Sequence, residues 1–99
     1  MSIVSVNSEN QVISIRGNLN KTSVEAELRE SISLDAGVNY DLDLAELEKF
    51  DSAGLAYIMN LIGKHQQSNG SVQLINCSDK VLQLIELSEL DDILSIKSN

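Results

Sequence analysis

The stretch Val38-Asn39-Tyr40-Asp41-Leu42-Asp43-Leu44 decides the fold class of this chain. Apolar and polar residues alternate strictly along it, which is the two-residue period of a β-strand with one buried face. Asp41 and Asp43 fall on the opposite, solvated face, so we do not interpret them as a catalytic carboxylate pair. A strand of this kind needs another layer of secondary structure to cover its apolar face.

A helix is predicted after this strand and a short connection that contains Leu47 and Phe50. Asp51-Ser52 begins the helix, and Ser68-Asn69-Gly70 provides a left-handed stop near Gln66. Its apolar residues recur at helical spacing and are Leu55, Ile58, Met59 and Ile62.

The residues before the central strand predict a hairpin and a helix. Two short β-prone runs flank a polar turn at residues 7–10, which is typical of an antiparallel hairpin. Gly17-Asn18-Leu19-Asn20 then breaks the strand, and Thr22 with Glu25 has the form of a capping box at a helix start. Val24, Leu28 and Ile32 follow as a helical stripe.

The last third predicts one more strand and one more helix. Val72, Leu74 and Ile75 form the strand, and Ser78 or Asp79 can cap a helix that carries apolar residues from Val81 to Leu87. The chain then ends in a weak strand or a packed tail formed by Ile93, Leu94 and Ile96. The order ββαβαβα, with that optional last strand, predicts an α/β sandwich in a single domain of 99 residues.

The amino-acid composition limits the kinds of partner that this protein is expected to bind. Fifteen acidic and seven basic side chains give a net charge of -8, which repels nucleic-acid phosphates and anionic lipid. A basic protein is the better partner, and the cluster of Glu86, Glu89, Asp91 and Asp92 favours it further. The same cluster can also be a solvated face that aids solubility. With three aromatic residues, the core must consist mainly of Leu, Ile and Val.

The sequence predicts a cytoplasmic protein. Cys77 is the only cysteine, so no intramolecular disulfide forms and a reducing compartment is expected. Residues 1–6 lack the basic and apolar segments of a signal peptide, and the longest apolar run, 55–59, is too short to span a membrane. We therefore expect contact with the inner membrane only through a partner, without direct insertion.

Residues that could perform catalysis are scarce. His65 lies thirteen residues after Ser52 on the predicted helix, about 20 Å along its axis, so it cannot act as a base for that serine. We expect His65 to be a surface residue and Cys77 an apolar filler at a strand end. The five glycines are scattered and form no phosphate-binding loop. We predict no enzymatic activity, no metal and no cofactor.

The segment Asp51-Ser52-Ala53-Gly54-Leu55 is the exception, because it follows a strand and opens a helix. Unpaired amides and the positive end of the helix dipole gather at such a position. The Ser52 hydroxyl could cap the helix, or carry a phosphate that those amides would favour. Gly54 removes side-chain bulk and would leave backbone open to an approaching molecule. Simple capping and a role in recognition or modification both stay open.

Several segments resemble the STAS domain family. Gly17-Asn18-Leu19-Asn20 is similar to the glycine-centred turn before the first helix of these domains. The segments 41–44, 50–55, 70–74 and 79–81 resemble the blocks that follow, in the same order. The resemblance covers residues 1–99 as one STAS domain. It implies a mixed four- to five-stranded sheet with helices mainly on one face, no catalytic activity, and reversible docking on a protein.

Two branches of that family fit. The compact chain and the segment after Asp79 resemble the small STAS subunit of the Mla phospholipid-transport system of Gram-negative bacteria. That resemblance implies an ABC ATPase partner and a role in outer-membrane lipid asymmetry, and it is the leading prediction. Serine rather than threonine at position 52 favours the alternative, an anti-sigma factor antagonist that an anti-sigma factor kinase phosphorylates at Ser52.

Both branches imply the same docking surface. We predict that its residues are Asp51, Ser52, Ala53, Gly54, Leu55, Ala56 and Met59, with acidic groups such as Glu48 at its rim. Ser52 is the predicted phosphorylation site. A phosphate there would block a partner by its size, and by repulsion if the partner is acidic. An enzyme with Ser52 as nucleophile is a third reading, for which the sequence offers no nearby base.

Overall fold

The structure is a computed structural model that describes residues 3–29, 32–90 and 92–97. The side chain of Leu28 and all of Asp91, which the sequence placed in a helical stripe and in an acidic cluster, lie outside the described part of the chain.

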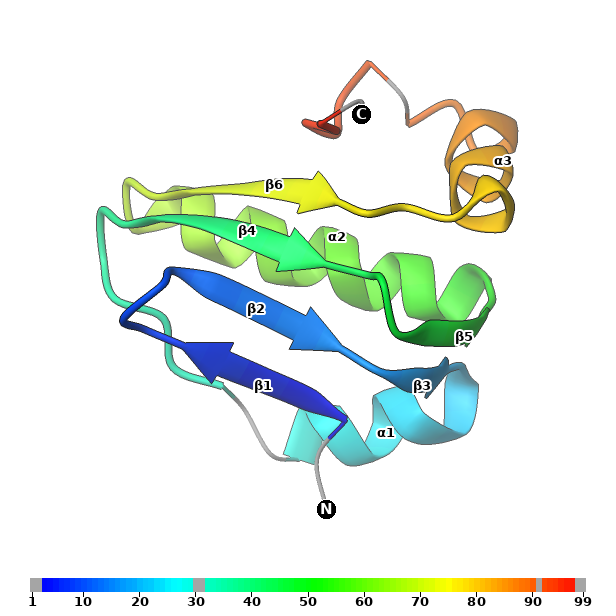
Figure 1. Ribbon diagram of the computed structural model, residues 1–99, viewed down its shortest axis with the longest axis horizontal. Coiled ribbons are helices and arrows are strands. Elements are labelled where there is room, and N and C mark those ends of the chain that lie inside the picture. The colour runs from blue at the N-terminus through cyan, green and yellow to red at the C-terminus, as the bar shows by residue number, and fades with distance from the viewer. Residues whose placement is uncertain (1–2, 30–31, 91, 98–99) are drawn as a thin grey trace.

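A four-stranded mixed sheet forms the centre of the molecule, with strand order β1-β2-β4-β6 (Figure 1). β1 (Val4–Asn7) and β2 (Val12–Ile15) form the predicted antiparallel hairpin. β4 (Asn39–Asp43), the strand on which the prediction began, runs parallel to both β2 and β6 (Ser71–Ile75). The alternation along β4 therefore reflects a central strand with one face against the core.

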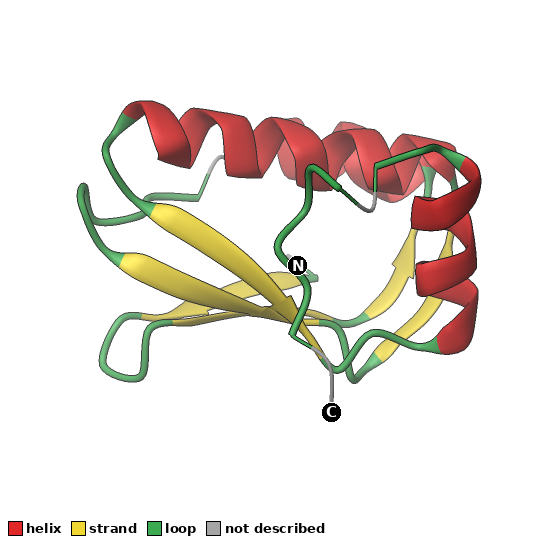
Figure 2. Ribbon diagram, turned by 90° about the horizontal axis from the view of Figure 1, so that it is seen from above, coloured by secondary structure: helices red, strands yellow, loops and turns green. Residues whose placement is uncertain are grey.

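Two helical crossovers explain why helices cover one face of this sheet. α1 (Lys21–Arg29) connects β2 to β4, and α2 (Ser52–Gln67) connects β4 to β6. Both crossovers step in the same direction along the sheet, and crossovers between parallel strands are right-handed almost without exception. Both helices must then lie on the same side, and Figure 2 shows α2 along that face. The predicted fold class is confirmed.

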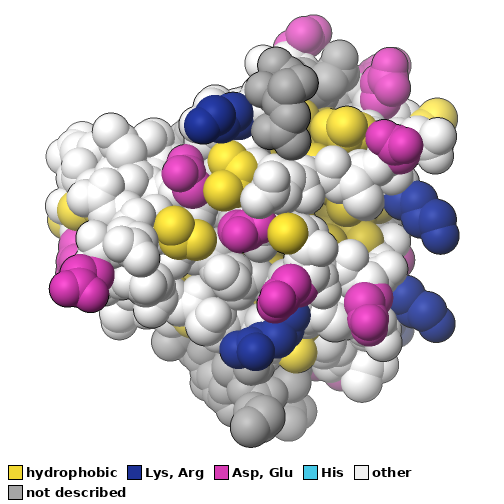
Figure 3. All heavy atoms as spheres, viewed as in Figure 1, with side chains coloured by type: hydrophobic (Ala, Val, Ile, Leu, Met, Phe, Trp, Pro, Cys, Tyr) yellow, Lys and Arg dark blue, Asp and Glu magenta, His cyan; other side chains and the backbone are white. Residues whose placement is uncertain are grey.

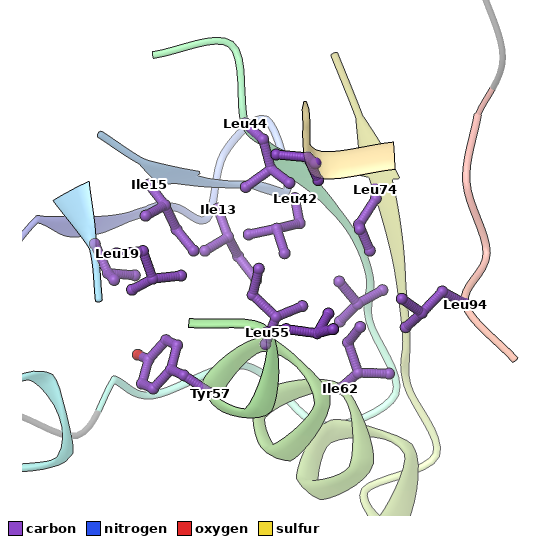
Figure 4. Packing of buried hydrophobic residues seen from close by; sticks show 14 of the residues in the cluster. Ile13, Ile15, Leu19, Leu42, Leu44, Leu55, Tyr57, Ile62, Leu74 and Leu94 are labelled. Carbon is purple, nitrogen blue, oxygen red and sulfur yellow. The ribbon is translucent and has the colours of Figure 1, made fainter. Parts of the chain in front are cut away.

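The core lies between the sheet and α2 (Figure 4). Ile13, Leu42 and Leu74 point from three neighbouring strands toward Leu55 and Ile62 of the helix, and these side chains are buried. The buried hydrophobic residues are leucine, isoleucine and valine, with Tyr40 and Tyr57 added. The composition had predicted a core of this kind.

A second, two-stranded sheet lies where the sequence predicted a break and a connection. β3 (Gly17–Leu19) pairs in parallel with β5 (Leu47–Phe50). These strands have three and four residues, and their register shifts between Gly17 and Asn18. Segments this short and irregular show no readable two-residue period, so the pairing depends on tertiary contact.

The predicted capping box of α1 was placed on the wrong residues. Asn20 and Ser23 form it: the Ser23 amide donates to Asn20 Oδ1 at 3.1 Å, and the Asn20 amide donates to Ser23 Oγ at 2.9 Å. The helix begins at Lys21, so Thr22 lies inside it and is exposed. Thr22 is therefore too late in the chain to be the cap.

The carboxyl-terminal part follows the prediction closely. Ser78 Oγ accepts a hydrogen bond from the Val81 amide and caps α3 (Asp79–Leu87). The following segment returns to β6, where Leu74 forms an isolated parallel bridge with Ile96. The Leu74 amide donates to the carbonyl oxygen of Ser95, and the Leu74 carbonyl oxygen accepts from the Lys97 amide. Leu94 is buried, so this segment combines the two predicted forms, a packed tail and a minimal strand.

The prediction of a surface histidine was wrong. His65 is only 4% exposed, and its Nε2 lies 2.6 Å from the carbonyl oxygen of Val38. Its ring meets Tyr40 edge to face, with centroids 5.3 Å apart. Gly70 leaves the space for this ring, because a β-carbon there would overlap it. His65 thus fixes the end of α2 against the start of β4.

Tyr57 provides a test of the α2 packing through pH. Burial, and secondly the negative charge of Glu27, raises the pKa of the Tyr57 hydroxyl above its ordinary value of 10.0. A raised pKa in the folded state means that the contribution to stability is complete below the unfolded pKa and is lost as pH rises through the folded pKa. Between about pH 9 and about pH 12, wild type should therefore lose more free energy of unfolding than Tyr57→Phe. Urea titrations across this range measure the difference, and parallel losses in the two proteins would contradict it.

Candidate functional site

Three helices begin at the same end of the molecule, on the right in Figure 1. The parallel strands β2, β4 and β6 point their carboxyl ends toward it. β2 leads through β3 to α1, β4 leads through β5 to α2, and β6 leads directly to α3. The chain segments that join strand to helix therefore meet at this end, where ligands of open α/β sheets commonly bind.

Asp51, not Ser52, caps α2. Asp51 has extended backbone angles, φ -127° and ψ -176°, and its Oδ1 accepts a hydrogen bond from the Gly54 amide at 2.9 Å. Its carbonyl oxygen accepts the first helical bond, from Leu55. The alternative in which the Ser52 hydroxyl caps the helix is therefore wrong. The carboxylate of the adjacent Asp51 already accepts the hydrogen bond from the Gly54 amide.

Ser52 is exposed in the first turn of the helix. Its hydroxyl makes no hydrogen bond to any residue that the structure describes. The amides of Ser52 and Ala53 also find no acceptor within the described chain. An exposed hydroxyl beside unused amides at the positive end of a helix can accept a phosphate without disturbing a capping bond.

Gly54 has a different task from the one predicted. It is buried, and a β-carbon on it would overlap the carbonyl oxygen of Leu19 and lie 3.1 Å from Cδ1 of Phe50. The same Leu19 carbonyl accepts the Asp51 amide at 3.4 Å. The open space that glycine creates is thus filled by β3 of the same chain. Gly54 seats the helix start on the small sheet.

The predicted docking residues separate into a surface layer and a supporting layer. Asp51, Ser52 and Ala56 are exposed, and Ala53 and Met59 are partly buried. Gly54 and Leu55 are buried, with Leu55 pointing into the core (Figure 4). We call the first group, Asp51, Ser52, Ala53, Ala56 and Met59, the Ser52 surface.

The Ser52 surface suits close approach by another protein. Ser52, Ala56 and Met59 are spaced at i, i+4 and i+7, so they lie along one face of α2. Serine and alanine allow a neighbouring backbone to come near, and methionine adapts to an irregular partner. Gly54 and Leu55 hold this face in position from beneath.

A groove of about 420 Å³ lies beside the Ser52 surface. β5 forms one side from Leu47 to Phe50, Asn20 and Asp51 contribute the starts of α1 and α2, and Ser78, Lys80 and Val81 contribute the start of α3. Its lining includes the acidic residues Glu48 and Asp51 together with Lys49 and Lys80. Basic side chains are visible along the same edge in Figure 3. The rim therefore has both signs of charge.

The sequence patterns did not predict Lys49 and Lys80 as part of this site. They are 31 positions apart in the chain, and no local motif connects them. Their proximity could have been predicted only from the topology of the sheet. Lys49 lies just before α2, which follows β4, and Lys80 lies in the first turn of α3, which follows β6. Once β4 and β6 are neighbours, their carboxyl ends bring these two positions together.

The other residues with reactive side chains, His65 and Cys77, are not placed to act in catalysis together with Ser52. His65 is at the opposite end of α2 from Ser52, and its Nε2 is hydrogen-bonded to the carbonyl oxygen of Val38. Burial raises the pKa of the Cys77 thiol, which disfavours its reactive thiolate form. Within the described ranges, no three His, Cys, Asp or Glu residues are placed to hold a metal ion. Nor does any helix in those ranges have the length and apolar character needed to cross a membrane.

The fold is an α/β sandwich in which a helix start with small residues lies at the carboxyl ends of the parallel strands. The family model described as Mlab, STAS domain, matches residues 3–95. The chain therefore belongs to the STAS domain family.

Two curated relatives are anti-sigma-B factor antagonists, from Listeria monocytogenes serovar 1/2a and Listeria innocua serovar 6a. Each is 29% identical over 72 residues, which are 73% of this chain and 63% of the relative. The match thus spans less than two thirds of these relatives.

Solved structures support the fold. A crystal structure of a candidate anti-sigma factor antagonist from Thermotoga maritima has a TM-score of 0.69 at 21% identity, covering 97% of this chain and 85% of that one. An NMR structure of the same protein, TM1081, has a TM-score of 0.64 at 23% identity, covering 100% and 82%.

The contact between Gly54 and Leu19 can be tested against a second glycine of the same helix. Gly54→Ala should destabilise the domain by about 1–3 kcal/mol, because the methyl group would overlap a backbone carbonyl. Gly63→Ala is the matched control: nothing lies within 4 Å of its added β-carbon, so better helix propensity should stabilise the domain by up to about 1 kcal/mol. Urea unfolding measures both, and equal effects at the two positions would contradict the packing role of Gly54.

Proposed function

We propose that this STAS domain is a non-enzymatic antagonist of an anti-sigma factor, which docks through the Ser52 surface and is released by phosphorylation of Ser52. The observation that carries the proposal is the free, exposed Ser52 hydroxyl next to the Asp51 cap. A residue needed for capping could not be modified without damage to the helix. Here the two roles belong to different residues, because Asp51 caps the helix and Ser52 carries the modifiable hydroxyl.

The switch would act on the partner and not on the fold. A phosphate adds roughly 1.5 to 2 negative charges, and at a helix amino terminus this charge is stabilising for the helix itself. The same group would stand in the middle of a surface built from small side chains, where it would obstruct a closely packed partner. Phosphorylation therefore should weaken docking while the domain stays folded.

The curated relatives support this branch over the one that the sequence placed first. Their names describe antagonists of anti-sigma-B factor, and their alignment covers 73% of this chain. By this likeness, the protein partner here is an anti-sigma factor kinase. A cytoplasmic location, independent of direct membrane insertion, is part of the same proposal.

Phosphorylation can be tested directly. Incubation with the cognate anti-sigma kinase and ATP should add one phosphate at Ser52, detected by mass spectrometry of the intact chain and of its peptides. Ser52→Ala should stay unmodified, because the exposed Ser78 at the start of α3 already uses its hydroxyl as the helix cap, and Ser8 lies in the β1–β2 turn. Modification at other serines, or none with an active kinase, would count against the proposal.

Mimicry of the phosphate provides a second test. Ser52→Asp should weaken binding to the kinase by at least about tenfold, which corresponds to about 1.4 kcal/mol, because a charge then stands in the docking surface. Ser8→Asp places the same charge in the β1–β2 turn and should bind like wild type. Calorimetric titration gives both affinities, and thermal unfolding confirms that both variants are folded. Equal weakening by the two substitutions would indicate a general charge effect instead.

The Mla-type subunit is the second candidate, because the family model that matches residues 3–95 carries that description. It predicts a stable complex with an ABC ATPase and raised ATP turnover. Ala56→Glu should break docking in either case, since Ala56 is exposed on the Ser52 surface. Co-purification separately with the kinase and with the ATPase therefore decides between the two partners, with Gln66→Glu at the far end of α2 as the control.

A further inference from the structure

The exposed large hydrophobic side chains of the described residues all fall within one stretch of the chain, residues 82–93. Leu82 and Leu87 of α3 are 37% and 82% exposed, and Ile93, in the turns after it, is 66% exposed. Single exposed leucines are common on protein surfaces, but clustered ones indicate contact with another molecule. None of these three belongs to the Ser52 surface.

The position of Leu87 is fixed by regular structure. It is the last residue of α3, where the Ser88 amide donates to the carbonyl oxygen of Leu84 and the Glu89 amide donates to that of Glu86. The next turn is held by a hydrogen bond from the Leu90 amide to the carbonyl oxygen of Ile85. Ile85 is buried and anchors the helix to the core. The exposed side chain is therefore presented by an ordered helix end.

Acidic side chains surround these apolar ones. Glu86, Glu89 and Asp92 are exposed, and the sequence has no lysine or arginine between Lys80 and Lys97. Figure 3 shows acidic and hydrophobic side chains together at the upper right, over α3 and the segment after it. The last turn of α3 has no basic residue, although cations there would offset the negative end of the helix dipole. This arrangement disfavours the isolated helix and favours a positively charged neighbour.

A shallow hollow completes the region. Gln83, Glu86 and Leu87 line about 440 Å³ of space and lie at i, i+3 and i+4 on the same helix face. We call Leu82, Gln83, Glu86, Leu87, Glu89 and Ile93 the α3 surface.

We propose that the α3 surface binds a basic amphipathic helix of a protein partner. The apolar face of that helix covers Leu87 and Ile93, and its lysine or arginine side chains face Glu86 and Glu89. A second copy of this chain would bring the same acidic groups against one another, and an anionic membrane would meet a net charge of -8. The chemistry therefore selects a basic protein segment over either of those.

The α3 surface is separate from the Ser52 surface. It occupies the exposed face and the last turn of α3, whereas the Ser52 surface begins at the first turn of α2. A partner could use both, or two partners could bind at once. The proposal does not depend on phosphorylation of Ser52.

The test uses the full chain, labelled with ¹⁵N, and a synthetic peptide of about 18 residues with leucine on one helical face and lysine on the other. The peptide should shift the amide signals of residues 82–93. Leu87→Ser should weaken its binding by at least about fivefold, whereas Leu87→Met, which keeps the apolar volume, should bind like wild type. Glu86→Gln should also weaken binding, with Glu9→Gln in the β1–β2 turn as the matched control.

Several results would overturn the proposal. Signal changes spread over all acidic regions, or centred on the Ser52 surface, would show binding elsewhere. Unchanged peptide affinity in both Leu87→Ser and Ile93→Ser would show that the apolar contact does not form. Two variants are used so that the test still stands if one of them misfolds. Self-association of wild type in sedimentation that Leu87→Ser abolishes would identify a second copy as the occupant. Binding to vesicles of anionic lipid that Leu87→Ser abolishes would identify a membrane.

Discussion

The close approach of Gly54 to the carbonyl oxygen of Leu19 is the contact on which the functional end of this domain depends. It brings the first turn of α2 onto β3, closer than any residue with a β-carbon allows. The Asp51 carboxylate then accepts the hydrogen bond from the Gly54 amide, so the helix is capped without the Ser52 hydroxyl. The glycine therefore acts inside the molecule, where it fixes the backbone from which Ser52 and Ala56 project.

Topology determines which residues join that helix start. Because β2, β4 and β6 are parallel, the starts of α1, α2 and α3 converge at one end of the sheet. The groove beside Ser52 is consequently built from positions near 20, 50 and 80, and it includes Lys49 and Lys80 as well as the acidic residues. Under the proposed function, the domain needs no reactive centre. It needs a rigid surface whose charge can change at one position, and the proposal assigns that position to the exposed Ser52 hydroxyl.

Much of the fold could be predicted from local patterns. Residues 38–44 gave the central strand, the hairpin followed from its β-prone runs, and the helix from Asp51 followed from its apolar spacing. The pairing of β3 with β5 could not be predicted, since three or four residues carry no clear period. The burial of His65 also escaped prediction, because its partners are Val38 and Tyr40 on another element and the space left by Gly70. At the site, the position of Ser52 was predicted, but its independence from capping was not.

The sequence by itself determined the strands with a two-residue period, the helices with an apolar stripe, the excess of acidic charge and the helix start at Asp51–Leu55. These properties depend on residues within one or two turns of each other, where backbone geometry relates spacing to position. Only the tertiary structure decided that Gly54 faces Leu19, that the two lysines border the groove, and that Leu87 and Ile93 stay uncovered. Such properties depend on which distant segments meet, and spacing along the chain does not specify that.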